Sequence, residues 1–214
     1  MKILSVLLII CLFAAATSQD TVIRYIKRFS QWLLFGHDPL PTVNEVKLSK
    51  YQGTWYEIFR LPKAYENCED GCINIDYKFT HYGGFVTIRC VSHENQTVLS
   101  EVKAFANPRD EKHTKFDFCL TNKRKCQDYQ ILEMEKDYEW VLIGSADRKS
   151  LWLLSRKSTL SSDIIKSLID RADELQFDTR RLIYQTEKCH PGQTLFRLDE
   201  KIVQDIFKFF HIGN

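Results

Sequence analysis

The sequence predicts an all-β fold: eight short antiparallel strands, with one α-helix packed outside them. Between residues 50 and 156, apolar and polar residues alternate with a period of two and turn residues recur, as is typical of an up-and-down barrel or a sandwich. Trp55, two residues after Gly53, and Arg156 at the end of an apolar run favour the barrel. A guanidinium stacked on an indole ring would seal one end of it. After Arg156 the apolar spacing becomes helical.

Eight segments have the length and alternation of strands, and turn residues such as Gly83, Asn95, Pro108 and Asp147 lie between them. In chain order the predicted strands cover residues 54–61, 73–80, 85–92, 98–107, 114–121, 128–134, 138–145 and 151–156. Tight connections of this kind join neighbouring antiparallel strands. An up-and-down order of strands is therefore expected.

The helix is predicted to begin at Ser161 or Ser162, because a serine side chain caps the first turn of a helix. Its apolar residues fall on one face, as expected for a helix that packs against the barrel: Ile164, Ile165, Leu168, Ile169 and Leu175. A last strand over residues 181–185 then leads to Cys189.

The first residues have the features of a secretory signal peptide. Lys2 precedes an apolar stretch over residues 3–16 and a small-residue cleavage site, so residues 1–18 are assigned to the signal. The apolar stretch is too short to span a bilayer. Residues 41–190 are predicted to form a single domain of ordinary size.

Two extensions, residues 19–40 and 191–214, are predicted to contain short amphipathic helices. Apolar residues at helical spacing lie beside basic ones: Val22, Ile26, Phe29 and Leu33 in the first extension, and Leu198, Ile202, Ile206 and Phe210 in the second. The simpler interpretation is that these faces pack on the barrel or on each other. The alternative is contact with a membrane surface.

Cysteine content and a glycosylation sequon predict a secreted, extracellular protein. Six cysteines remain after the signal peptide, and an even number in a secreted chain favours three disulfides. The sequon Asn95-Gln96-Thr97 predicts N-glycosylation at Asn95. The formal net charge of +2 implies no nucleic acid partner, and nothing in the sequence predicts an oligomeric state.

Three motifs resemble the signatures of the lipocalin family, in the branch of apolipoprotein D and the bacterial outer-membrane lipocalin. Residues 50–58 are similar to the first signature, residues 135–138 to the second and residues 151–156 to the third. The three motifs stand in the family's order, and the resemblance covers residues 41–189. It implies an eight-stranded barrel that transports or sequesters a small hydrophobic ligand: a fatty acid, lysophospholipid, sterol, retinoid or bilin.

If Trp55 faces the interior, strand alternation predicts which residues line the ligand site. These residues are mostly aromatic and branched aliphatic: Ile75, Tyr77, Val86, Ile88, Val102, Phe116, Phe118, Tyr129, Ile131, Trp140, Leu142, Trp152 and Leu154. Periodicity does not separate a hollow barrel from a filled one. The resemblance favours a cavity, and the small residues Ser100, Ala104 and Gly144 on the same phase support one.

One end of the barrel is predicted to be a structural floor, and the other an open mouth. The floor residues are Gly53, Trp55, Glu57, Asp137, Tyr138 and Arg156. Glu57 and Glu133 fall on the inward phase, and a buried carboxylate is costly unless it is paired. A polar network at the floor is expected, with contact to a polar group of the ligand as the alternative. The mouth loops are residues 62–72, 92–97, 121–127 and 146–150, the first acting as a lid.

The disulfide framework follows in part from the resemblance. Cys72 and Cys189 occupy positions similar to the family's link between the second strand and the C-terminal segment, a bridge that closes a long loop. Cys119 and Cys126 flank a short stretch that suits a hairpin turn, which favours a bridge between them. Cys68 and Cys90 then form the last pair by elimination. The predicted pairs are Cys72–Cys189, Cys119–Cys126 and Cys68–Cys90, with exchange of Cys68 and Cys72 left open.

Neither catalysis nor a cofactor is expected. A metal site at Cys68 and Cys72 would need further ligands at suitable spacing, and the six histidines are scattered, so no metal is expected. A cysteine-dependent isomerase is the alternative enzyme class. It would require Cys90 to be an unpaired, reactive thiol.

Overall fold

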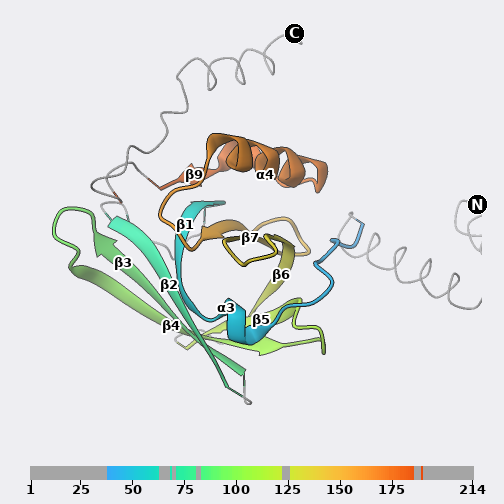
Figure 1. Cartoon of the computed structure of the whole chain (residues 1–214), viewed down its shortest axis with the longest axis horizontal. Helices are drawn as coiled ribbons and strands as arrows, with labels where there is room; N and C mark the ends of the chain where they lie inside the picture. Colours follow the sequence, from blue (N-terminus) through green and yellow to red (C-terminus); the bar gives the residue numbers. More distant parts are fainter. Residues whose placement is uncertain are drawn as a thin grey trace, which may run out of the picture. The chain divides into compact units, whose positions relative to one another are not determined.

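A computed structural model of the chain describes residues 38–62, 68, 71–80, 83–121, 126–185 and 189. Eight of its strands form the barrel, and a ninth short strand follows the long helix (Figure 1). The strands are β1 Gly53–Arg60, β2 Gly71–Thr80, β3 Gly83–Ser92, β4 Val98–Pro108, β5 Lys115–Leu120, β6 Gln127–Met134, β7 Trp140–Gly144, β8 Leu151–Ser155 and β9 Ile183–Tyr184. The sequence therefore predicts all nine strands, most of them to within two residues.

The sheet closes on itself. Each strand from β2 to β7 pairs with the next along the chain, β8 pairs with β1, and β1 also pairs with β2. Because every pairing is antiparallel, the arrangement is an up-and-down barrel and not a sandwich. Phe59 and Arg60, at the end of β1 opposite the predicted floor, pair with β9 instead of β2. We call this end of the barrel its upper half, and the segment that follows the long helix completes the wall there.

A short helix that the sequence does not predict lies at the start of the barrel. Helix α3, Leu48–Tyr51, is one turn long and immediately precedes β1. Four residues are too few for a helical period to be visible in the sequence. The backbone of Val46 donates a hydrogen bond to the carbonyl of Lys112, in the loop between β4 and β5, so α3 belongs to the floor end.

Helix α4, Ser162–Glu174, packs on the outside of the barrel (Figure 1). Its N-cap is Ser161, whose side chain accepts a hydrogen bond from the backbone of Ile164 at 3.4 Å. Leu168 and Ala172 are its buried residues. A single 3-10 turn, Thr179–Arg181, then replaces the first residue of the predicted last strand.

Three disulfides are present, and they have the connectivity that the sequence favoured: Cys68–Cys90, Cys72–Cys189 and Cys119–Cys126. The alternative in which Cys68 and Cys72 exchange partners is therefore wrong. The Cys72–Cys189 bridge spans 117 residues and ties β2 to the segment after β9.

Several predictions concern residues outside the part of the chain that is described. These are the signal peptide, the helices of both extensions, and most of the loop predicted to be the lid. Among the described helices, none has the length and apolar character needed to cross a membrane.

Candidate functional site in the barrel interior

The barrel interior gathers all but two of the side chains predicted to line it. Those in or against its apolar cluster are Ile75, Tyr77, Val86, Ile88, Val102, Phe116, Phe118, Tyr129, Ile131, Trp152 and Leu154. They come from β2 to β6 and from β8, and Trp55 of β1 lies in the same cluster. Alternation from a single inward tryptophan therefore predicts most of the interior.

The prediction for β7 is wrong, because Trp140 and Leu142 are not in this cluster. Val141 and Ile143 occupy the interior instead. The cause is a β-bulge in β6 between Ile131 and Glu133, which inserts one residue and reverses the predicted phase from Glu133 through β7. Leu142 is fully buried, but it pairs with Glu133 on the outer face.

Glu133 and Gly144 are displaced from the interior by the same bulge. The carboxylate of Glu133 accepts a hydrogen bond from Nε of Arg171 on α4 at 2.7 Å, so it faces the helix. A side chain at Gly144 would meet the ring of Phe177, 2.5 Å from the added carbon. The glycine thus admits the segment after α4, and it is not evidence for open space inside.

Burial of the inward side chains changes along the barrel. Trp55 and Ile131 are fully buried, and the exposed fraction of Val86 is 1 %. Ile88, Val102 and Trp152 pack against the same cluster and yet are only partly buried. Ile88, Val102 and Trp152 therefore keep part of their apolar surface accessible.

Trp55 and Arg156 close the floor in the geometry that the sequence predicts. The guanidinium carbon of Arg156 lies 3.9 Å from the centre of the Trp55 ring. Its nitrogens donate hydrogen bonds to four carbonyls at the end of α3 and the start of β1, those of Lys50, Tyr51, Gln52 and Thr54. The positive charge thus satisfies the carbonyls at the C-terminus of α3, which carry partial negative charge.

The second signature also contributes to the floor. Tyr138 adopts a positive φ of 64°, in the tight turn between β6 and β7, and its hydroxyl accepts a hydrogen bond from the backbone of Lys47 at 2.8 Å. Asp137 is exposed, and its backbone donates to the carboxylate of Glu135. Gly53 has a φ of 95°, a conformation that favours glycine, where the chain leaves α3.

Three tyrosine hydroxyls meet inside the barrel. Tyr129 of β6 shares hydrogen bonds with Tyr51 of α3 at 3.0 Å and with Tyr77 of β2 at 2.7 Å. The three residues are between 1 and 6 % exposed. Burial raises the pKa of each hydroxyl well above its usual range, because a phenolate would be poorly solvated there. We call these three residues the tyrosine triad.

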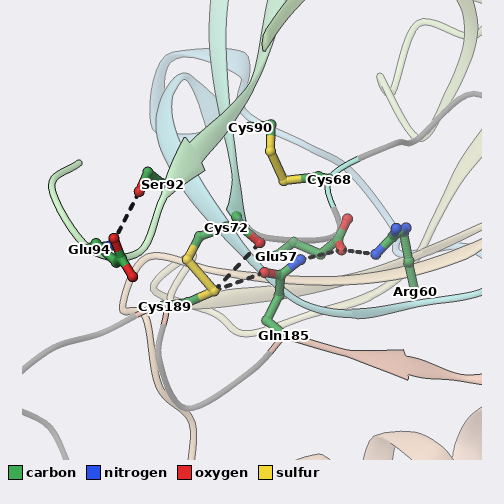
Figure 2. The surroundings of a disulfide bond; sticks show 10 residues. Glu57, Arg60, Cys68, Cys72, Cys90, Ser92, Glu94, Gln185 and Cys189 are labelled. Carbon is green, nitrogen blue, oxygen red and sulfur yellow. Dashed lines mark hydrogen bonds and ion pairs between the residues drawn. A yellow bond between two sulfur atoms is a disulfide. The ribbon is translucent and has the colours of Figure 1, made fainter. Parts of the chain in front are cut away.

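Glu57 does not lie with the floor residues. Its carboxylate accepts hydrogen bonds from Nη1 of Arg60 at 2.8 Å and from Nε2 of Gln185 at 2.9 Å, beside the Cys72–Cys189 bridge (Figure 2). Glu57 is 2 % exposed and Arg60 is 6 % exposed. Burial raises the pKa of Glu57 despite the neighbouring guanidinium. We call Glu57, Arg60 and Gln185 the upper polar cluster.

The upper polar cluster is tied to the end of the described chain. The backbone of Gln185 donates to the carbonyl of Ile58 at 3.0 Å, which continues the pairing of β9 with β1. The side-chain oxygen of Gln185 lies 3.2 Å from Sγ of Cys189. The disulfide therefore contacts Gln185, which donates a hydrogen bond to the buried carboxylate of Glu57.

Two functional groups of the interior were missed in the sequence. Tyr51 stands four residues before Trp55, where no strand pattern reaches, and only its place within the first signature marks it. Arg60 is brought to the side of Glu57 by a bulge between Glu57 and Phe59. Strict alternation would have placed it on the opposite face.

The metal site and the reactive thiol considered from the sequence can both be compared with the described residues. No three of their His, Cys, Asp and Glu side chains gather in a way that would hold a metal ion. Cys90 is bonded to Cys68. The thiol that a cysteine-dependent isomerase would require at this position is therefore not free.

Comparison with known proteins agrees with this geometry. The family model described as a lipocalin-like domain matches residues 46–187. The outer membrane lipoprotein Blc of Vibrio cholerae is 27 % identical over 146 residues, which cover 66 % of this chain and 83 % of that protein. Temperature-induced lipocalin-1 of Arabidopsis thaliana is 26 % identical over 149 residues, or 67 % of this chain and 80 % of its own.

Two solved structures share the fold at lower sequence identity. Lobster apocrustacyanin A1 has a TM-score of 0.52 at 15 % identity and covers 64 % of this chain and 78 % of its own. Insecticyanin from the tobacco hornworm Manduca sexta has a TM-score of 0.50 at 20 % identity, covering 70 % of this chain and 85 % of its own. At this level of identity the likeness concerns the fold.

Proposed function

We propose that this chain, which belongs to the lipocalin family, binds a small hydrophobic ligand reversibly inside its barrel, without chemical conversion. The observation that carries the proposal is the partial burial of Ile88, Val102 and Trp152, three apolar side chains that face the interior. A ligand that covers them removes apolar surface from water, at roughly 25 cal/mol per Å². The sealed floor gives the site a single direction of access.

The ligand contacts that we propose are the inward residues of the predicted set, without Trp140 and Leu142. Apolar and aromatic groups dominate this set, and a few polar groups stand among them, as in typical small-molecule sites. Candidate ligands remain a fatty acid, lysophospholipid, sterol, retinoid or bilin. The similarity to Blc supports placing the chain in the branch that its signatures resemble.

The most direct test is to identify what the protein carries. Protein purified from its own source would be examined by native mass spectrometry, and the bound molecule extracted and identified. We expect an apolar molecule at one equivalent that is lost on denaturation. Recovery of protein without any bound molecule, together with failure of the candidate lipids to bind afterwards, would contradict the proposal.

We also propose that the protein is secreted and glycosylated. Asn95 is exposed in the connection between β3 and β4, and three disulfides suit an oxidising compartment. Expression in a secreting eukaryotic cell should release protein whose mass falls on treatment with an amidase specific for N-linked glycans. The variant Asn95→Gln should be secreted at the lower mass.

Contact of the terminal extensions with a membrane is a separate hypothesis. Deletion of residues 19–38 and 194–214 should abolish binding to liposomes if these segments mediate it. Unchanged liposome binding by the truncated chain contradicts that hypothesis and leaves ligand binding unaffected.

A further inference from the structure

The tyrosine triad is polar at a place where the barrel is otherwise apolar. Its hydroxyls come from α3, β2 and β6, which lie far apart in the sequence and meet only in the folded barrel. Their surroundings are aromatic. The ring of Phe118 stacks on Tyr129 with centroids 5.6 Å apart, and that of Trp55 lies 5.1 Å from Tyr51.

Three buried hydroxyls add little to stability compared with three phenyl groups. A hydroxyl that leaves water must recover its hydrogen bonds inside, and replacement of both partners by apolar groups of the same shape is nearly neutral. The three hydroxyls carry three hydrogens and six acceptor lone pairs, and the contacts among them, that between Tyr51 and Tyr77 included, use at most three of each. A ligand oxygen can take the place of one internal contact and accept its hydrogen, and a ligand hydroxyl can also donate to a remaining lone pair.

The triad lies next to the accessible part of the inner wall. The ring centroid of Trp152, which is partly buried, lies 6.2 Å from that of Tyr129. A ligand that covers Trp152 thus reaches the layer of the triad. An aliphatic or ring system would occupy the wall above, and its terminal atoms would meet the hydroxyls.

We propose that the tyrosine triad recognises a neutral oxygen group, a hydroxyl or carbonyl, at the inner end of the ligand. This inference rests on the proposed function and specifies its ligand class. Tyr129, which bonds to both other hydroxyls, is the central contact. Tyr51, supplied by the floor helix, makes α3 part of the binding site as well as of the floor.

Charge distribution favours a neutral group over a carboxylate. A buried anion needs a cation or several donors. Arg156 is engaged by four backbone carbonyls and a tryptophan ring, and Arg60 by Glu57. The pKa values of the triad are raised, so its hydroxyls stay protonated and can donate. The triad supplies hydrogen bonds without a formal charge.

The test compares three probes of equal chain length: 1-decanol, 1-decanethiol and decanoic acid at pH 8. The thiol replaces one oxygen by sulfur, a weak donor and acceptor. Dissociation constants would be measured from tryptophan fluorescence for the full chain and for the variants Tyr129→Phe, Tyr77→Phe and Tyr184→Phe. Tyr184→Phe is the matched control, because it also removes one tyrosine hydroxyl, but from β9 and outside the interior cluster.

Tyr129→Phe and Tyr77→Phe should each lower the affinity for 1-decanol by about tenfold and change the affinity for 1-decanethiol by less than twofold, because only the alcohol forms a good hydrogen bond. Tyr184→Phe should change neither. Tyr77→Phe keeps the bond between Tyr51 and Tyr129, so it provides the comparison if Tyr129→Phe does not fold.

Equal weakening of the alcohol and the thiol would overturn the inference, because the effect would then be structural. So would tighter binding of decanoic acid than of 1-decanol to the unmodified protein. Both results leave reversible binding in the barrel intact. If none of the three probes binds the unmodified protein although a molecule is recovered from protein purified from its own source, this inference fails and the proposed function stands. If the candidate lipids also fail to bind and no molecule is recovered, both fail.

Discussion

The floor and the upper half of the barrel use polar residues in opposite ways. At the floor, Arg156 remains partly accessible and satisfies four backbone carbonyls that would otherwise lack partners. In the upper half, Glu57 and Arg60 are almost completely buried and satisfy each other. The floor cation therefore stabilises local backbone structure, whereas the upper ion pair carries the cost of removing two charges from water.

The two ends also differ in how they are held. The floor is held by non-covalent contacts of residues 46–60 with Lys112, Tyr138 and Arg156. All three disulfides lie toward the upper end, and one of them attaches the segment after β9 to β2. This difference predicts that loss of the long disulfide disturbs the upper half more than the floor.

The largest expected effect is loss of the long disulfide. The double variant Cys72→Ala/Cys189→Ala should lower the free energy of unfolding by about 4 to 5 kcal/mol, because the bridge closes a loop of 117 residues in the unfolded chain. Urea denaturation measures it. The control Cys119→Ala/Cys126→Ala removes a bridge that spans 7 residues and should cost about 2 to 3 kcal/mol. Equal losses would contradict this account of the upper end.

Breaking the upper ion pair comes next. Arg60→Met should lower the free energy of unfolding by about 3 kcal/mol, because Glu57 would be left buried without its cation. Glu57→Gln/Arg60→Met should recover part of that loss. A double-mutant cycle in urea measures the coupling between the two residues, and additive effects of the single variants would show that the pair is not coupled.

Arg156→Met should have a smaller effect, about 2 kcal/mol, from loss of the contact to Trp55 and of the carbonyl hydrogen bonds. Affinity for 1-decanol should stay within about twofold of the original, since the guanidinium lies below the ligand. The control Lys157→Met breaks an exposed ion pair to Glu139 and should cost no more than about 0.5 kcal/mol. A large loss of affinity in Arg156→Met would remove the distinction between floor and site.

The smallest effect concerns pH. The pKa of Glu57 is raised by burial in the folded state, above the value of 4.5 for a solvated carboxyl. Its protonated form is therefore favoured by folding, and this contribution is fully present below pH 4.5 and is lost as the pH rises through the folded-state pKa. The stability of the unmodified protein relative to Glu57→Gln should therefore fall as the pH rises from 4.5 through the folded-state pKa. Urea denaturation at several pH values measures the difference in stability between the two proteins, and a difference that is constant or rises with pH would contradict a raised pKa of Glu57.

Strand order, closure and the floor contact could be predicted from sequence because they depend on alternation and on local signatures. Trp55 sets the phase of the interior, and the turns between strands preserve it as far as Ile131. The bulge at Leu132 then reverses the phase. Four residues predicted to face the interior therefore face outward: Glu133, Trp140, Leu142 and Gly144. A bulge inserts one residue without changing composition, so no pattern in the sequence marks it.

The polar groups of the interior were harder to predict. Glu57 and Arg60 come together through a second bulge, and Gln185 reaches them from a strand of only two residues. Tyr51 meets Tyr77 and Tyr129 through a one-turn helix. Glu57 and Arg60 are three residues apart, but the other contacts join segments that are distant in sequence, and their distances depend on how the barrel closes.

The central claim is that ligand enters the inner wall above the floor, where Trp152 faces inward and Trp140 faces outward. Tryptophan emission should be recorded during titration with 1-decanol for the full chain and for Trp152→Phe and Trp140→Phe. We expect a shift to shorter wavelength that persists in Trp140→Phe and disappears in Trp152→Phe, because the ligand covers the ring of Trp152 and not that of Trp140. A shift that persists without Trp152 and disappears without Trp140 would contradict it.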